Sequence, residues 1–292
     1  MKKCLFTGVA TALATPFDDK GVNVKEFSRF IEFQINAGVN ALVVCGTTGE
    51  SSTMTKVEKV QAIKCALSTS KKRVPVIVGT GSNNTLATIE MSILAEELGA
   101  DGLLIVTPYY NKTTQNGLIE HYKAIANSVN IPIILYNVPS RTGMNILPET
   151  CFELSKIDNI VGIKEASGNI SQVAKIAQLC GNDFSIYSGN DDQILPILSL
   201  GGKGVISVLS NIKPKLTCKI VNSFFENNTA TSRNEQLNAL PLINALFAET
   251  NPIPIKYAIN CIGYDFGTPR LPLVECSSNQ KSTIEKFLNE IL

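Results

Sequence analysis

Eight short runs rich in valine, isoleucine and leucine recur along the chain, and this repeat constrains the fold more than any other feature. The runs occupy residues 8–15, 41–49, 74–81, 102–110, 132–139, 160–167, 184–191 and 203–211. They are continuously apolar, as is typical of strands that are covered on both faces in a parallel sheet. Their starts lie 19 to 33 residues apart, which leaves room for a loop, a helix and a second loop between parallel neighbours.

The segments between these runs have the periodicity of amphipathic helices. Apolar residues recur at spacings of three and four in residues 24–38, 55–70, 85–100 and 117–130. Eight strands that alternate with helices predict an α/β fold, a closed (β/α)₈ TIM barrel of the usual size of about 250 residues. A doubly wound open sheet is the alternative.

The last quarter of the chain has no further convincing strand. Helical patterns follow in residues 213–226, 233–249, 253–262 and 278–292. We therefore expect two domains: a barrel with the active site at 1–226, and a C-terminal helical domain at 227–292.

Composition argues against several classes of protein. Lysine and arginine (26) nearly balance aspartate and glutamate (25), so we expect no nucleic-acid-binding surface and no attraction to anionic membranes. The chain has no run of 18 or more apolar residues, so we predict no transmembrane helix. The eight cysteines lack C-x-x-C spacing and there is one histidine, so we predict no metal site. Scattered cysteines of this kind fit a reducing cytoplasm.

Lys164 stands directly after the apolar residues 160–163, where a strand entering a core normally continues with another apolar side chain. A buried ammonium group is costly unless it has a partner or a chemical use. A core ion pair with Glu165 is one reading, although neighbouring strand residues point to opposite faces. The other reading is a nucleophile, because a poorly hydrated and partly uncharged amine can form a Schiff base with a carbonyl.

Other polar residues collect at the ends of the predicted strands, which converge on one face of a barrel. Tyr136 ends the strand before Lys164 and could relay protons, or could simply hydrogen-bond at the rim. Arg141 follows in a loop and could bind a carboxylate, unless it is only solvated. Thr47 and Thr48, in the sequence GTTGE, could hold a carboxylate or relay protons, or could form an ordinary turn before a helix.

Two further features are expected to have no catalytic role. His121 lies in a helical pattern, and we expect it on the helix surface. Asp191 and Asp192 could suggest a metal, but an acidic pair of this kind is more often found at a helix N-terminus.

Taken together, several motifs resemble those of the dihydrodipicolinate synthase family, and the resemblance covers nearly the whole chain. They are GTTGE at 46–50, TPYYNK at 107–112, YNVPSRTG at 136–143, GIKEASG at 162–168, SGND at 188–191 and GVISVLSN at 204–211. The resemblance implies a lyase that needs no cofactor and condenses pyruvate with L-aspartate 4-semialdehyde. The product would be 4-hydroxy-tetrahydrodipicolinate, on the route to diaminopimelate and lysine.

The same resemblance implies roles for individual residues. Lys164 would form the Schiff base with pyruvate. Tyr136, Thr47 and Tyr110 would form a proton relay, with Tyr110 inserted from the neighbouring subunit of a tight dimer. The substrate-binding residues would be Thr48 for the pyruvate carboxylate, Arg141 for the semialdehyde carboxylate, and Gly189 and Ile206 along the pocket. A homotetramer built from two such dimers is implied.

Two alternatives remain at this point. N-acetylneuraminate lyase shares the lysine, the tyrosine and a similar Gly/Thr turn, but generally has no arginine at the place of Arg141. A catalytically silent barrel that binds a small molecule is less favoured.

In lysine-inhibited relatives, histidines match Lys56 and Lys59, and a glutamate matches Ala87. Cations in place of those histidines, and the missing carboxylate, disfavour lysine binding, so inhibition by lysine is not expected.

Overall fold

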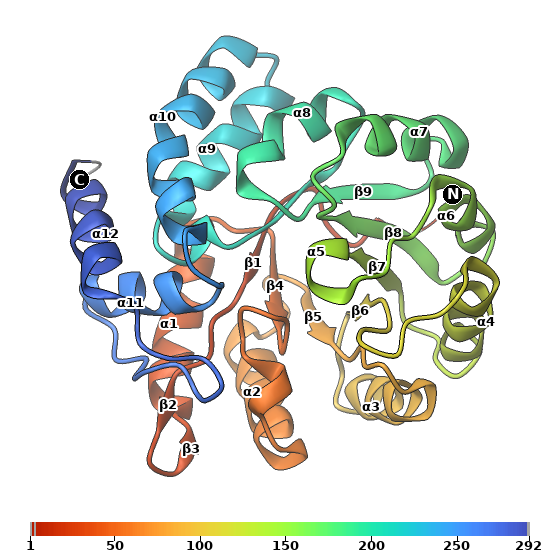
Figure 1. The fold of residues 1–292 in the computed structure, drawn as a ribbon, viewed down its shortest axis with the longest axis horizontal. Coiled ribbons are helices and arrows are strands. Elements are labelled where there is room, and N and C mark those ends of the chain that lie inside the picture. Colours follow the sequence, from red (N-terminus) through yellow and green to blue (C-terminus); the bar gives the residue numbers. More distant parts are fainter. Residues whose placement is uncertain (1, 3, 291–292) are drawn as a thin grey trace.

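Eight parallel strands close into a barrel that is surrounded by helices, in a computed structural model that describes residues 2 and 4–290 (Figure 1). The barrel strands are β1 (Gly8–Ala12), β4 (Ala41–Val44), β5 (Val76–Gly79), β6 (Gly102–Val106), β7 (Ile133–Asn137), β8 (Ile160–Glu165), β9 (Ser185–Ser188) and β10 (Gly204–Ser207). Each pairs with its neighbours along the chain, and β1 pairs with both β4 and β10. The predicted TIM barrel is therefore confirmed, and each of the eight predicted runs contains one barrel strand.

Helices cover the outside of the barrel and continue beyond it. They are α1 (Val24–Asn36), α2 (Lys56–Ser70), α3 (Thr85–Glu97), α4 (Gln115–Ala126), α5 (Pro139–Thr142), α6 (Pro148–Ser155), α7 (Ile170–Cys180), α8 (Ile194–Ser199), α9 (Pro214–Phe225), α10 (Thr229–Phe247), α11 (Ile253–Cys261) and α12 (Ser278–Glu290). Shorter elements are β2 (Phe17–Asp18), β3 (Gly21–Val22), η1 (Ser51–Thr53), η2 (Asp191–Gln193) and η3 (Leu209–Asn211). The helix α10 starts earlier than residue 233, because Asn228 caps it by accepting a hydrogen bond from the Thr231 amide.

Alternation along the strands divides the apolar side chains between two cores. In β5, for example, Ile77 packs inside the barrel, whereas Val76 and Val78 pack outward against the helices. Tyr136 on β7 and Ile206 on β10 belong to the inner set. The strands are thus buried on both faces, which explains why their sequences are continuously apolar.

Strand β8 contains one irregularity that decides where Lys164 points. Its register with β7 shifts so that Ile133 and Ile134 pair with Ile160 and Gly162, leaving one extra residue in β8. Val161 consequently packs inside the barrel, while Ile160 and Ile163 both pack outward. Lys164, the next residue, therefore faces the interior. A side chain at residue 162 would not fit, because a Cβ there would lie 2.3 Å from the Ser185 carbonyl oxygen.

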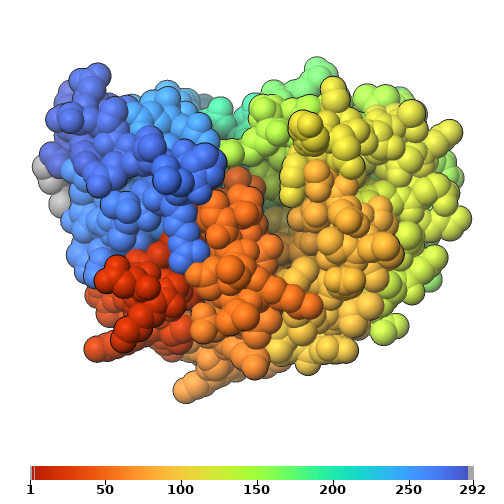
Figure 2. Space-filling model, turned by 60° about the horizontal axis from the view of Figure 1, so that its bottom comes forward, coloured from red at the N-terminus to blue at the C-terminus, as the bar shows by residue number. Residues whose placement is uncertain are grey.

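Helix α10 packs against α9, and α11 and α12 pack against α10 and against each other; the chain thereby returns to the N-terminal half of the barrel (Figure 1). In Figure 2 the blue C-terminal residues lie directly against the red and orange segments. The division into domains at residues 226 and 227 remains a prediction. Across residues 2 and 4–290, none of the helices combines the length and apolar character that crossing a membrane would require.

Candidate active site

Lys164 is buried at the carboxyl end of β8, with 6% of its surface exposed. Its partner in the β7–β8 ladder is Tyr136, and the Lys164 Nζ lies 4.3 Å from the centre of the Tyr136 ring. Among the described residues, no hydrogen bond or ion pair engages this amine. The lysine is therefore held by packing and by the face of an aromatic ring, which leaves its nitrogen available to react.

The loop after β9 passes directly over the side chain of Lys164. A Cβ added to Gly189 would lie 3.1 Å from the Lys164 Cε and 2.6 Å from the Ala166 Cβ. A larger residue would clash with Ala166 and crowd the lysine side chain, so glycine at 189 keeps space beside Lys164. Ile206 is fully buried in the interior cluster that also contains Tyr136.

Glu165 points away from Lys164, to the helix side of β8. Its carboxylate accepts hydrogen bonds from the side chains of Asn137 and Gln172 and from the Ser167 amide, at 2.7–3.2 Å. Neighbouring strand residues face opposite sides of a sheet, as this pair shows. The ion pair between Lys164 and Glu165, which the sequence left as one reading, is not formed.

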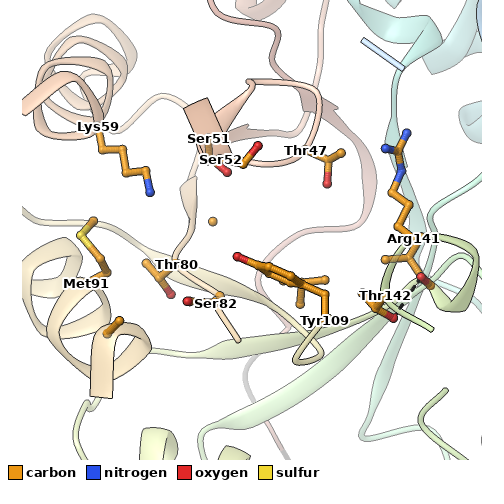
Figure 3. Close-up of a pocket in the computed structure, with 15 residues that line it drawn as sticks. Thr47, Ser51, Ser52, Lys59, Thr80, Ser82, Met91, Tyr109, Arg141 and Thr142 are labelled. Atoms are coloured by element: carbon orange, nitrogen blue, oxygen red, sulfur yellow. Dashed lines mark hydrogen bonds between the residues drawn. The ribbon is translucent and has the colours of Figure 1, made fainter. Parts of the chain in front are cut away.

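A pocket of about 360 Å³ opens above these strand ends and is shown in Figure 3. Thr47, Tyr109 and Arg141 lie around it, and Lys59 extends toward it from α2. Its lining includes two cations and several hydroxyl groups, but no carboxylate from the described part of the chain. The pocket is therefore suited to anionic small molecules.

A second, smaller cavity of about 40 Å³ shares part of its lining with the pocket and is also lined by the buried Tyr136. Thr47 and Tyr136 both line it, and Thr47 also lines the larger pocket. Cys45 lies on its wall, where burial raises the pKa of the thiol to about 12. That thiol stays protonated at neutral pH and does not compete with the amine as a nucleophile.

Thr48 and Arg141 are linked through a residue that sequence reasoning missed. The Asn251 side chain donates a hydrogen bond from Nδ2 to Thr48 Oγ1 (3.0 Å), and the Asn251 carbonyl accepts one from Arg141 (3.0 Å). Arg141 itself is exposed on α5, and Asn251 precedes α11. No motif marks Asn251 in the sequence, because it lies 110 residues after Arg141 in an ordinary loop.

A buried ion pair beneath the GTTGE loop was also missed. Lys256 on α11 and Glu50 are 0% and 1% exposed, and their charged atoms lie 2.7 Å apart. Burial lowers the pKa of Lys256, and the neighbouring Glu50 carboxylate opposes this shift. The other Glu50 oxygen accepts a hydrogen bond from the Arg270 amide (2.8 Å). The C-terminal helices thereby fix the loop that carries Thr47 and Thr48.

Tyr110 stands apart from the other predicted residues. It is 91% exposed and has a left-handed backbone (φ +70°). Of the predicted site residues, Thr47, Tyr136 and Arg141 line the two cavities, whereas Tyr110 does not, and neither do the buried residues Lys164, Thr48 and Ile206 or Gly189. Left-handed backbone is unfavourable for a tyrosine and is often found at functional sites. Among the described residues, Tyr110 makes no hydrogen bond or ring contact with Lys164, which is 6% exposed.

The structure corrects the expectation for His121, whereas Asp191 lies at a helix N-terminus as expected. His121 is buried, not on the helix surface; it contacts the Thr85 hydroxyl (3.0 Å), and burial lowers its pKa to about 4. Asp191 begins η2, but its carboxylate is buried and accepts hydrogen bonds from the amides of Val208 and Leu209. Burial raises the pKa of Asp191 above its ordinary value despite these bonds. Asp191 thus braces the loop after β10.

Comparison with known proteins gives consistent matches over nearly the whole length. The 4-hydroxy-tetrahydrodipicolinate synthase 1 of Clostridium acetobutylicum is 57% identical over 278 residues, which is 95% of this chain and 94% of that protein. A crystal structure of dihydrodipicolinate synthase from Thermotoga maritima is similar with a TM-score of 0.97 and 43% identity, covering 98% of this chain and 99% of that one. The structure of the chloride-inhibited dihydrodipicolinate synthase from Acinetobacter baumannii, complexed with pyruvate, is similar with a TM-score of 0.95 and 39% identity. The match covers 97% of this chain and 98% of that one.

The family comparison agrees with these individual matches. Residues 5–291 match the sequence model of the dihydrodipicolinate synthetase family. The resemblance stated from the motifs is thereby confirmed: this chain belongs to the dihydrodipicolinate synthetase family.

Proposed function

We propose that this chain is a lyase that condenses pyruvate with L-aspartate 4-semialdehyde to form 4-hydroxy-tetrahydrodipicolinate, on the route to diaminopimelate and lysine. The observation that carries the proposal is the buried Lys164 amine, which packs against Tyr136. Tyr136 lines a small cavity, and Thr47 is common to this cavity and to the larger pocket that is suited to anions. The names of the relatives support the reaction, and the Acinetobacter relative was crystallised with pyruvate.

The first half of the reaction is chemistry of the Lys164 amine. The neutral amine attacks the keto carbon of pyruvate, and loss of water gives an imine that is protonated on nitrogen. Loss of a proton from the methyl group then gives an enamine. The Tyr136 phenol, beside the amine and in the same small cavity as Thr47, is placed to move these protons toward the pocket.

The second half begins when the enamine carbon attacks the aldehyde carbon of the semialdehyde. The Arg141 guanidinium, at the pocket mouth, binds the carboxylate of this second substrate and holds its aldehyde toward the enamine. Attack of the substrate's own amino group on the imine carbon then closes the ring and releases Lys164.

Turnover of the two substrates tests this function. Purified protein is expected to consume pyruvate and L-aspartate 4-semialdehyde together and to leave N-acetylneuraminate uncleaved. Added lysine is expected to leave the rate unchanged, because Lys59 lines the pocket where a carboxylate would be needed to bind an amino group. Cleavage of N-acetylneuraminate without condensation would overturn the proposal.

Replacement of Arg141 by alanine is expected to raise KM for the semialdehyde about 10- to 100-fold, because a charge-assisted pair with a carboxylate is lost. Trapping of pyruvate on Lys164 by borohydride should be nearly unchanged, since that step needs no second substrate. Steady-state kinetics with each substrate varied in turn measure the effect. An unchanged KM for the semialdehyde would show that Arg141 does not bind the carboxylate of this substrate.

We further propose that the chain forms a tight dimer in which Tyr110 completes the relay of the partner subunit, with two dimers forming a tetramer. The support is the exposure and the left-handed backbone of Tyr110. An exposed tyrosine held in this way is suited to insertion into a neighbouring molecule.

Mixing two inactive variants tests this sharing of sites. In a hybrid dimer of Lys164→Ala and Tyr110→Phe chains, one site contains both an intact lysine and an intact tyrosine. Random reassortment should therefore restore about a quarter of wild-type activity, because half of the dimers are hybrids and each has one intact site of two. If Tyr110 acts within its own chain, the mixture stays as inactive as its components.

We place the enzyme in the cytoplasm. All eight cysteines are free thiols, some buried and some exposed, which suits a reducing compartment. We also retain the division into a barrel domain at 1–226 and a helical domain at 227–292, in which the second domain supports the mouth of the first.

A further inference from the structure

Asn251 occupies a position between the two groups that are proposed to bind substrate carboxylates. It is 5% exposed, and it contacts Thr48 through its side chain and Arg141 through its backbone carbonyl, both at 3.0 Å. Thr48 belongs to the loop after β4, and Arg141 belongs to α5, after β7. One residue from the C-terminal segment thus contacts a loop and a helix that lie far apart in the sequence.

The direction of the side-chain bond determines what Thr48 can offer a ligand. Asn251 Nδ2 has only hydrogen-bond donors, so the Thr48 oxygen must accept. Within residues 2 and 4–290, the Thr48 hydroxyl makes no other hydrogen bond, and the Asn251 Oδ1 atom is buried without a partner. The hydroxyl hydrogen of Thr48 is therefore left free to donate to another acceptor.

We propose that Asn251 is a positioning residue: it orients the Thr48 hydroxyl as a donor, so that Thr48 can bind the carboxylate of pyruvate. The inference rests on the proposed function, because it assigns a ligand to Thr48. A carboxylate only accepts hydrogen bonds, so its site must present donors. Threonine can serve as donor or acceptor, and its neighbour decides which.

The isosteric variant Asn251→Asp reverses this arrangement. An ionised aspartate in the same place offers only acceptors, so the Thr48 hydroxyl donates to it and no longer to the substrate. The contact of Arg141 is made to the backbone carbonyl, which the substitution retains. We expect the apparent affinity for pyruvate to fall by about 10- to 100-fold, the range for a hydrogen bond to a charged group.

The experiment measures borohydride trapping of pyruvate on Lys164 as a function of pyruvate concentration, which requires no second substrate. The effect of Asn251→Asp is measured twice, once in the wild-type protein and once in a protein that already carries Thr48→Val. An added negative charge weakens pyruvate binding in both backgrounds, whereas the reversed hydroxyl exists only when Thr48 is present. The factor by which Asn251→Asp lowers the apparent affinity for pyruvate is therefore expected to be at least about fivefold smaller in the Thr48→Val background than in the wild type.

Glu249→Gln is the matched control. Glu249 lies with Asn251 on a cavity beside Arg141, but its carboxylate contacts the Ser277 amide at 3.3–3.4 Å and the Cys276 thiol rather than Thr48, so pyruvate affinity should not change. Thermal unfolding of each variant checks that the fold is kept. A penalty for Asn251→Asp below about twofold, or an equal penalty in both backgrounds, overturns the inference while the proposed function stands. Failure of the wild type to trap pyruvate overturns both.

Discussion

Replacement of Lys164 by alanine is expected to lower kcat by about 10³-fold or more, because the variant lacks the amine that is proposed to form the imine. The structure supports this expectation. Lys164 is the lysine that packs against Tyr136 inside the barrel, and Gly189 leaves space beside it. Treatment with pyruvate and borohydride should add the mass of a reduced pyruvyl group to the peptide that carries Lys164 in the wild type, and nothing in the variant.

Two further variants test whether the loss of activity comes from the missing nucleophile. One keeps the positive charge at residue 164, and the other removes a lysine elsewhere on the protein. Lys164→Arg keeps a positive charge but supplies no reactive amine, and it should be as inactive as the alanine variant. Lys156→Ala removes an exposed lysine that is paired with Glu153, and it should retain full activity and labelling. Label on any other lysine of the wild type, or turnover by Lys164→Arg, would contradict the proposed mechanism.

Replacement of Lys256 by methionine is expected to destabilise the protein by about 3–5 kcal/mol, because it leaves the buried Glu50 carboxylate without its cation. Glu50 is 1% exposed, so water cannot substitute for the missing partner. Methionine has a similar length and can keep the packing against the Phe17 ring, over which the Lys256 Nζ now lies at 4.3 Å. Urea unfolding followed by circular dichroism measures the change.

A double variant and a surface pair make this test specific. Adding Glu50→Gln to Lys256→Met removes the uncompensated charge and keeps an acceptor for the Arg270 amide, so more than half of the lost stability should return. Lys156→Met breaks an exposed pair at 2.7 Å and should cost less than about 1 kcal/mol. Equal losses for the buried and exposed pairs would mean that burial of Lys256 has no energetic consequence.

The architecture could be predicted from sequence because it depends on a repeated apolar pattern. Each barrel strand is buried on both faces, so its hydrophobic run is continuous and easily found. The site could be predicted in part, since Lys164, Tyr136 and Thr47 stand at the ends of such runs. The structure places them near one another, while their catalytic roles remain proposals.

The parts that were missed depend on contacts between distant segments. Glu50 and Lys256 are 206 residues apart, and nothing in their local sequence indicates that they pair. Asn251 is in the same situation, because its function depends on Thr48, 203 residues away. The expectation for His121 was wrong because helical periodicity does not reveal that α3 covers that side of α4, where Thr85 meets the ring.

The extra residue in β8 has a chemical consequence that the hydrophobic pattern alone does not reveal. If the same sequence formed a regular strand, alternation would turn Ile163 and Glu165 inward and send Lys164 among the surrounding helices. The barrel would then present a carboxylate, which cannot form an imine, where it now presents an amine. Gly162, which permits the irregular pairing beside Ser185, therefore contributes to the reaction without touching either substrate. A barrel could retain its lysine and still be inactive if β8 lost this extra residue, because the lysine would then face away from the barrel interior.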